Sequence, residues 1–342
     1  MIPFSGVDAP LGHGGDLAAA RRLFPDAPES FLDLSTGINP NPYPLPPLAE
    51  DIFARLPEQA ALDRLAKIAA TAYGVPAASC VVAAPGTQIL LPLVAGLTRP
   101  GRAAIVAPTY SEHARAAALA GHKVSEVGDL DAVGDAALVI LTNPNNPDGR
   151  LLARNDLIAL GKTLHARGGL LVIDEAFMDV APPGQSLAGD VGRGGIVMLR
   201  SFGKFFGLAG LRLGFALAAP PLAVRLAALL GPWAVSGPAL AVGATALADR
   251  AWIETTRDNL GTAAARLDAI LSGAGLSIVG GTSLFRLARA RDAGELFQHL
   301  GRAGILIRIF ADRADWLRFG LPASEPDWQR LEIAMAAFRG NG

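Results

Sequence analysis

Lys204 is the residue in this sequence best suited to covalent chemistry. The chain has four lysines and 26 arginines, so most of its basic positions carry a guanidinium. Lys204 lies in the segment Ser201-Phe202-Gly203-Lys204, directly after an apolar run. An unprotonated amine can form a Schiff base with a carbonyl compound, which a guanidinium cannot do. An ordinary surface lysine fits the same spacing, so other residues must decide between the two interpretations.

Asp174 is a second candidate, because it ends the apolar run Leu170-Leu171-Val172-Ile173. In an α/β sheet, groups at the carboxyl ends of strands face bound ligands. A carboxylate at that place can keep a proton on the ring nitrogen of a heteroaromatic cofactor, which makes the ring an electron sink. The alternative is an aspartate that only caps the following helix.

Three further elements can contact such a ligand. The loop 143–149 is rich in Asn, Pro and Gly, which favours a tight turn and leaves side-chain amides free to donate. Gly86-Thr87 stands where an apolar strand passes into a helix, and the backbone N–H groups at a helix start bind phosphate. Ser201 and Arg212 flank Lys204 and can add a hydroxyl and a guanidinium.

Short apolar runs alternate with helix-like segments between about residues 78 and 218. Runs of this kind, separated by helices, predict a mainly parallel sheet covered on both faces. The predicted strands are Val81-Val82-Ala83, Ala104-Ile105-Val106, Leu138-Val139-Ile140-Leu141, Leu170-Leu171-Val172-Ile173, Ile196-Val197-Met198-Leu199 and Leu213-Gly214-Phe215-Ala216.

The pattern changes after Pro238. It predicts a long helical stretch over roughly 239–272, strands at 276–279 and 283–287, a helix over 293–303, the apolar run 305–309 and a last helix over 325–339. We therefore expect a large ligand-binding domain over 40–240. A smaller α+β domain comprises 241–342 with the Gly- and Pro-rich segment 1–39, which packs with that domain or across the entrance to the site.

Composition narrows the class of protein. Hydrophobic residues make up 51% of the chain, but its apolar runs are shorter than the roughly 20 residues of a spanning helix, so we expect no membrane protein. A formal charge of −1 gives no general attraction to nucleic acid. The single cysteine, Cys80, lies in an apolar run and the five histidines lack metal-ligand spacing, so we predict no metal site. The N-terminus has no secretory pattern, and we expect a cytoplasmic protein.

As a set, these motifs resemble the fold-type I, aspartate-aminotransferase-like enzymes that use pyridoxal 5'-phosphate (PLP). The spacing also fits, since 28 residues separate Asn146 from Asp174 and eight separate Lys204 from Arg212. The resemblance covers nearly the whole chain and implies an α/β fold of PLP fold type I. Such a fold has a large domain with a mainly parallel seven-stranded sheet, plus a smaller α+β domain.

The resemblance assigns a role to each candidate. Lys204 binds PLP covalently, and Asp174 pairs with its ring nitrogen. Asn146 bonds the ring oxygen and Tyr110, in Ala107-Pro108-Thr109-Tyr110-Ser111, stacks on the ring. The phosphate ligands are Gly86, Thr87, Ser201 and Arg212.

Two branches that act on phosphorylated substrates are the most similar: threonine-phosphate decarboxylase of cobalamin biosynthesis and histidinol-phosphate aminotransferase. The segments Gly12-His13-Gly14-Gly15-Asp16 and Asp33-Leu34-Ser35-Thr36-Gly37-Ile38-Asn39-Pro40 resemble the decarboxylase branch more strongly. The implied substrate-binding residues are His13, Gly14, Asn39, Asn146, Arg308 and Arg318, with Arg318 on the carboxylate and Arg308 on a distal phosphate. A mobile His13 and solvated surface arginines are the ordinary alternatives.

The implied reaction is decarboxylation of L-threonine O-3-phosphate to (R)-1-aminopropan-2-yl phosphate. The same residues can instead support transamination, as in histidinol-phosphate or related aminotransferases. A non-catalytic PLP-fold binding module is a third alternative, which the joint presence of Lys204 and Asp174 disfavours.

Two positions depart from the pattern of relatives. Phe177 stands where many have a tyrosine that bonds the ring oxygen, and Leu56 stands where aminotransferases commonly have a tyrosine that reaches the neighbouring subunit's phosphate. A homodimer is still expected, but without that contact.

Overall fold

The computed structural model describes residues 14–339, so His13 lies outside the described residues. The chain packs as two compact units: unit 1 contains the chain up to Asn41 and from Arg257 onward, and unit 2 contains Pro42–Thr256. The domain limits expected from the sequence, at 39/40 and 240/241, stay a prediction. No helix in residues 14–339 is both long enough and apolar enough to cross a membrane.

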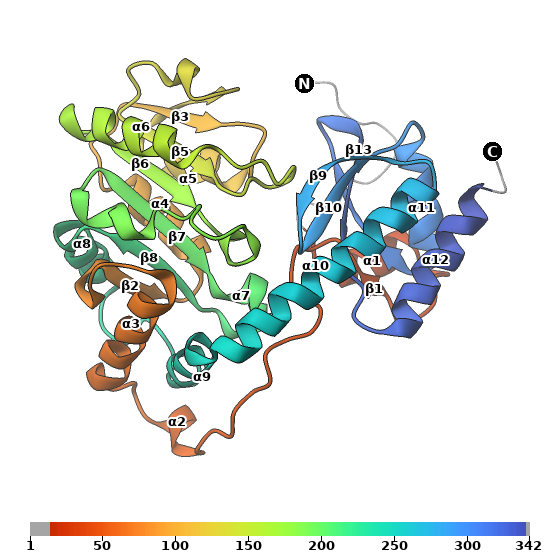
Figure 1. The fold of residues 1–342 in the computed structure, drawn as a ribbon, viewed down its shortest axis with the longest axis horizontal. Coiled ribbons are helices and arrows are strands. Elements are labelled where there is room, and N and C mark those ends of the chain that lie inside the picture. The colour runs from red at the N-terminus through yellow and green to blue at the C-terminus, as the bar shows by residue number, and fades with distance from the viewer. Residues whose placement is uncertain (1–13, 340–342) are drawn as a thin grey trace. The chain divides into compact units, whose positions relative to one another are not determined.

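Unit 2 is built on a seven-stranded sheet (Figure 1). The strand order is β2-β8-β7-β6-β5-β3-β4, and every neighbouring pair is parallel except the two that involve β8. The strands are β2 (Val81–Ala84), β3 (Arg102–Val106), β4 (Lys123–Val127), β5 (Leu138–Thr142), β6 (Leu170–Asp174), β7 (Ile196–Ser201) and β8 (Gly214–Ala218). All residues of β5 and β6 are buried, as expected of central strands covered on both faces. The predicted α/β class is confirmed.

Helices cover both faces of this sheet. One face packs with α4 (Thr87–Ala95), α5 (Glu112–Leu119) and α8 (Pro220–Leu230) around a core that includes Leu90, Val172 and Leu199. The other face packs with α3 (Gln59–Tyr73) and α6 (Arg154–Ala166). The remaining helices of the unit are α2 (Asp51–Ala54), α7 (Phe202–Phe205), α9 (Gly237–Ala248) and the start of α10 (Arg250–Gly273).

The helical stretch predicted over roughly 239–272 consists of two helices, α9 and α10. The break lies at Asp249, whose φ of −84° and ψ of 80° are not helical. Its side chain accepts a hydrogen bond from the backbone N–H of Trp252 (3.0 Å) and another from the Tyr43 hydroxyl (3.1 Å). Asp249 therefore caps the start of α10 and holds the segment that enters unit 2.

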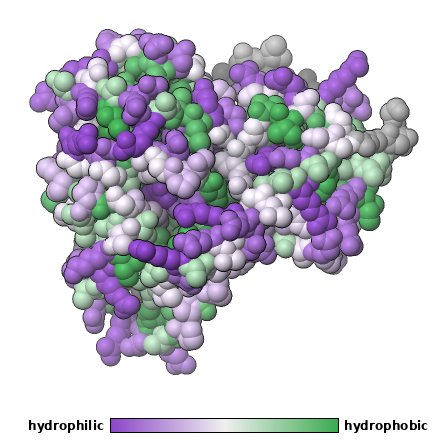
Figure 2. All heavy atoms as spheres, viewed as in Figure 1, coloured by the Kyte–Doolittle hydropathy of each residue, from purple (hydrophilic) through white to green (hydrophobic). Residues whose placement is uncertain are grey.

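Unit 1 contains a four-stranded antiparallel sheet in the order β12-β13-β10-β9 and a parallel pair, β1 with β11. The apolar run 305–309 divides between these two sheets at Ile307. The elements are α1 (Leu17–Leu23), β1 (Leu32–Asp33), β9 (Ser277–Thr282), β10 (Phe285–Arg289), α11 (Ala293–Arg302), β11 (Ile305–Leu306), β12 (Arg308–Phe310), β13 (Arg313–Gly320) and α12 (Glu325–Arg339). On the face that Figure 2 shows, hydrophilic and hydrophobic residues are interspersed over both units.

Candidate active site

Asp174 lies at the carboxyl end of β6 in a buried pair with His113. Its Oδ2 is 3.2 Å from Nε2 of His113, a side chain that has no solvent exposure, and its Oδ1 accepts the N–H of Ala176 (3.0 Å). Among residues 14–339 no group hydrogen-bonds Nδ1 of His113. A carboxylate only accepts hydrogen bonds, so His113 must carry its proton on Nε2 to donate to Asp174. In that tautomer Nδ1 has no proton, so no buried N–H lacks an acceptor.

The sequence did not indicate a role for His113, which is one of five histidines without metal-ligand spacing. Nε2 also lies 3.2 Å from Oγ1 of Thr142, whose hydroxyl is 2.8 Å from that of Thr109. The available signal was spacing, since His113 follows Tyr110 by one helical turn. The two rings meet edge to face with centroids 5.6 Å apart.

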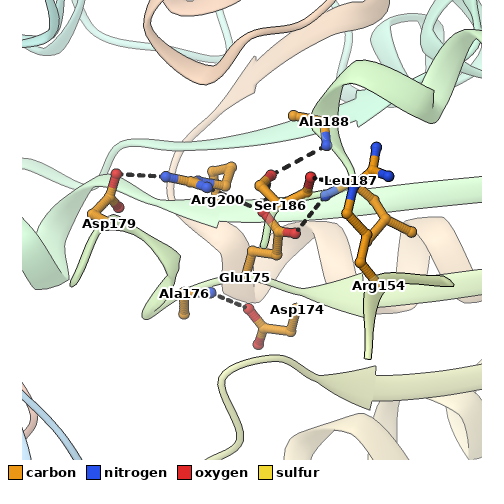
Figure 3. A network of polar contacts seen from close by, with 9 residues as sticks. All are labelled: Arg154, Asp174, Glu175, Ala176, Asp179, Ser186, Leu187, Ala188 and Arg200. Carbon is orange, nitrogen blue, oxygen red and sulfur yellow. Dashed lines mark hydrogen bonds and ion pairs between the residues drawn. The ribbon is translucent and has the colours of Figure 1, made fainter. Parts of the chain in front are cut away.

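A second charged cluster, which sequence reasoning also missed, lies on the other face of the sheet (Figure 3). Arg200 donates from Nη1 to Oε2 of Glu175 (3.0 Å) and from Nη2 to Oδ1 of Asp179. All three side chains are buried. Burial alone lowers the pKa of the guanidinium, but the charges of Asp179 and Glu175 outweigh it and raise the pKa, so Arg200 stays charged.

The predicted phosphate ligands come together at the start of α4. Ser201 pairs with Gly214 in the sheet, and Gly214 pairs with Ala84, which precedes the loop to Gly86. Gly86 has a φ of 86°, and a Cβ built on it would lie 2.5 Å from Nη2 of Arg212. Only glycine leaves room for the guanidinium beside the first N–H groups of the helix. This combination of helix start, hydroxyl and guanidinium suits a phosphate.

The other PLP candidates lie around the same strand ends. Nζ of Lys204 is 5.8 Å from the centroid of the Phe177 ring, which places α7, directly after β7, beside the loop after β6. Asn146 follows β5, and the register pairs Thr142 of β5 with Asp174. Tyr110 donates its hydroxyl to Oε1 of Gln88 (3.1 Å), which links it to α4.

The substrate candidates Arg308 and Arg318 are cross-strand neighbours in unit 1. Arg318 is 8% exposed, donates from Nη2 to the carbonyl of Ser35 (2.8 Å) and lies over the Phe285 ring. Burial, and next the positive charge of Arg308, lower the pKa of Arg318 to about 10, while Asp33 acts in the opposite direction. Two guanidinium groups on neighbouring strands form an element that is chemically suited to an anion.

Gly14 lies beside Ser35, whose carbonyl also accepts the hydrogen bond from Arg318. A Cβ on Gly14 would lie 2.4 Å from the Ser35 carbonyl oxygen, and the N–H of Gly15 donates to the Ser35 hydroxyl (2.8 Å). Asn39 is buried, and its Oδ1 accepts the N–H of Asn41 (2.9 Å). The structure therefore brings Gly14, Ser35 and Arg318 together, whereas Asn39 is held by a turn of its own.

A mainly parallel seven-stranded sheet with a lysine, a buried aspartate and a glycine–arginine phosphate cradle at one edge is the large unit of a fold-type I PLP enzyme. The family model for aminotransferase class I and II matches residues 53–335, and the chain belongs to this family.

Individual relatives agree with this assignment. Threonine-phosphate decarboxylases of Sinorhizobium sp and Pseudomonas aeruginosa are each 43% identical over 96% of this chain, which covers 99% and 98% of theirs. The crystal structure of histidinol-phosphate aminotransferase from Sinorhizobium meliloti in complex with pyridoxal-5'-phosphate has the same fold. Its TM-score is 0.82 at 20% identity, over 99% of this chain and 96% of that one.

Proposed function

We propose that this protein decarboxylates L-threonine O-3-phosphate to (R)-1-aminopropan-2-yl phosphate and CO2 in cobalamin biosynthesis. Similarity to threonine-phosphate decarboxylases runs over almost the full length of both chains. The observation that carries the proposal is that Asp174, Lys204 and the glycine–arginine pair that we assign to the phosphate lie at the carboxyl ends of strands of one sheet.

PLP fits the residues at this edge. The cradle of Gly86, Thr87, Ser201 and Arg212 suits its phosphate, and a buried carboxylate suits its ring nitrogen. When bound, PLP supplies an electron sink conjugated to the α-carbon of an amino acid, so that the carboxylate can leave as CO2.

The residues of the chain then have separate tasks. We assign Lys204 to covalent attachment and, with its amine released, to delivery of a proton to the α-carbon in place of the lost carboxylate. His113 orients Asp174, which keeps a proton on the ring nitrogen. Asn146 would donate to the ring oxygen and Tyr110 would cover the ring. Because Phe177 has no hydroxyl, it adds no second donor to that oxygen.

For the substrate, we assign the carboxylate to Arg318 and the phosphate to Arg308. A charge-assisted, bidentate contact with a planar guanidinium suits both anions. Gly14, Asn39 and Asn146 are assigned to the same substrate, together with His13.

The test is to supply threonine phosphate with and without a 2-oxo acid and to identify the products. We expect CO2 and the amino alcohol phosphate in equal amounts, without any need for a 2-oxo acid. Strict dependence on a 2-oxo acid, with no CO2 released, would identify the protein as an aminotransferase instead.

We further propose that the protein acts in the cytoplasm as a homodimer. The buried, unpaired Cys80 fits a reducing compartment. Phe53, Leu56 and Trp233 are each at least 60% exposed, and Pro57 and Trp233 line one groove of about 700 Å³. Exposed apolar side chains at one groove favour a protein partner. Trp233→Glu should shift the mass in sedimentation equilibrium from dimer to monomer, and a monomeric wild type would contradict the proposal.

A further inference from the structure

The ends of β6 and β7 carry different groups on their two faces. Side chains alternate along a strand, so Asp174 continues the face of Val172, and Ser201 continues the face of Leu199, toward α4 and α5. Glu175 and Arg200 are the adjacent residues and therefore face the opposite side. Figure 3 shows the carboxyl groups of Asp174 and Glu175 pointing away from each other.

Arg200 ties several segments together from that opposite face. Its guanidinium bonds Glu175, directly after β6, and Asp179, in the turn Met178–Val180. It also lies 4.4 Å from the centroid of the Tyr73 ring in α3. The two terminal nitrogens of the Arg200 guanidinium thus hold Glu175, which follows β6, and the turn Met178–Val180 against the end of β7.

Glu175 is held from a second side as well. Its Oε2 accepts the Ser186 hydroxyl (2.7 Å), and its Oε1 accepts the N–H of Leu187 (3.2 Å). Its own N–H donates to the carbonyl of Leu199 in β7 (2.9 Å). Because side chain and backbone are both bonded, the peptide that links Asp174 to Glu175 has little freedom to turn.

We propose that Arg200 is a positioning residue for the cofactor, an inference that rests on the proposed function. Asp174 and Ser201 serve opposite ends of PLP, its ring nitrogen and its phosphate. The Glu175–Arg200–Asp179 cluster sets the span between these two groups without touching PLP. A mainly stabilising role would not require ions, because a buried ion pair adds little stability compared with apolar packing.

Arg200→Lys tests this inference, since lysine keeps the charge but lacks the fork that bridges two carboxylates. We expect the dissociation constant for PLP, titrated by visible absorbance, to rise at least tenfold. Pyridoxal has no phosphate and does not need the span, so its dissociation constant should rise less than threefold. Glu175→Gln, which keeps the shape of the side chain, should give a smaller change with the same preference for PLP over pyridoxal.

The control is Leu164→Ala, which removes buried packing in α6 and should lower the thermal midpoint without changing PLP binding. An equal loss of PLP and pyridoxal affinity in Arg200→Lys, or no loss of either, would overturn the inference. So would a loss of PLP affinity in Leu164→Ala as large as that in Arg200→Lys. Wild-type protein that binds PLP but does not decarboxylate threonine phosphate would refute the proposed function alone.

Discussion

The two units handle buried charge in opposite ways. In unit 2, Asp174 pairs with His113, and Arg200 lies between two carboxylates. In unit 1, buried Arg318 has another arginine, Arg308, as its cross-strand neighbour. Burial of a charge is unfavourable unless opposite charges or hydrogen bonds compensate it. Opposite charges compensate the buried ions of unit 2, whereas buried Arg318 donates to the backbone carbonyl of Ser35 and has a second positive charge on the neighbouring strand, which suits an anionic ligand.

We assign the charge-paired region of unit 2 to the cofactor and the two arginines of unit 1 to the substrate. A cofactor retained through many turnovers needs a rigid site, which strand ends in fixed register provide. A substrate must enter and leave, and we assign its anionic groups to Arg308 and Arg318 on neighbouring strands. Substitutions in either region therefore test whether the cofactor and the substrate are bound separately.

Lys204→Ala should have the largest effect, because it removes the amine assigned to both covalent attachment and proton delivery. We expect decarboxylation to fall at least ~10³-fold. The measurement is CO2 release at saturating PLP, with the exposed Lys162→Ala as the control. Activity within tenfold of wild type would exclude Lys204 from that role.

Asp174→Asn keeps the shape of the side chain but removes the charge that holds the ring-nitrogen proton. We expect kcat to fall about 10²- to 10³-fold, because the charge acts where electrons accumulate during the reaction. Steady-state rates at saturating PLP measure it. A drop in kcat of less than threefold would mean that the His113–Asp174 pair is only structural.

Arg318→Gln should act on the substrate alone. Loss of a charge-assisted hydrogen bond, about 1.5–3 kcal/mol, raises KM for threonine phosphate roughly 10- to 100-fold. The affinity for PLP should stay unchanged, as should both constants in the exposed Arg313→Gln control on the same strand. A fall in PLP affinity would remove the distinction between the two regions.

Arg308→Gln should weaken substrate binding yet stabilise the ligand-free protein by about 0.5 kcal/mol, since it relieves repulsion at Arg318. Folding lowers the pKa of Arg318 to about 10, so the unfolded chain holds this proton more tightly. Stability from this group therefore rises as pH increases above about 10. Urea unfolding at pH 8 and pH 10.5 should show a smaller rise in the variant than in wild type.

Phe177→Tyr should have the smallest effect. It supplies the hydroxyl that many relatives place at the ring oxygen, and one hydrogen bond of about 1 kcal/mol tightens PLP binding roughly fivefold. Titration of the apoprotein measures the change. Weaker binding would mean that the buried hydroxyl finds no partner beside PLP.

The sequence alone singled out Lys204, Asp174 and the Gly86–Thr87 turn, and it predicted six of the seven strands of unit 2 but not β4. These features are local, since an apolar run and the polar residue that ends it are adjacent in the chain. It predicted a helical stretch over roughly 239–272 but not the break at Asp249, because the Tyr43 hydroxyl that helps to hold Asp249 comes from a distant segment.

Only the tertiary structure decided which side chains share a face at the ends of β6 and β7. His113 reaches Asp174 from a helix on one side, and Arg200 reaches Glu175 and Asp179 on the other. Both arrangements depend on strand register and helix packing between segments far apart in the chain. Residue type and local spacing therefore indicate the chemistry, while contacts between distant segments determine which charges are paired.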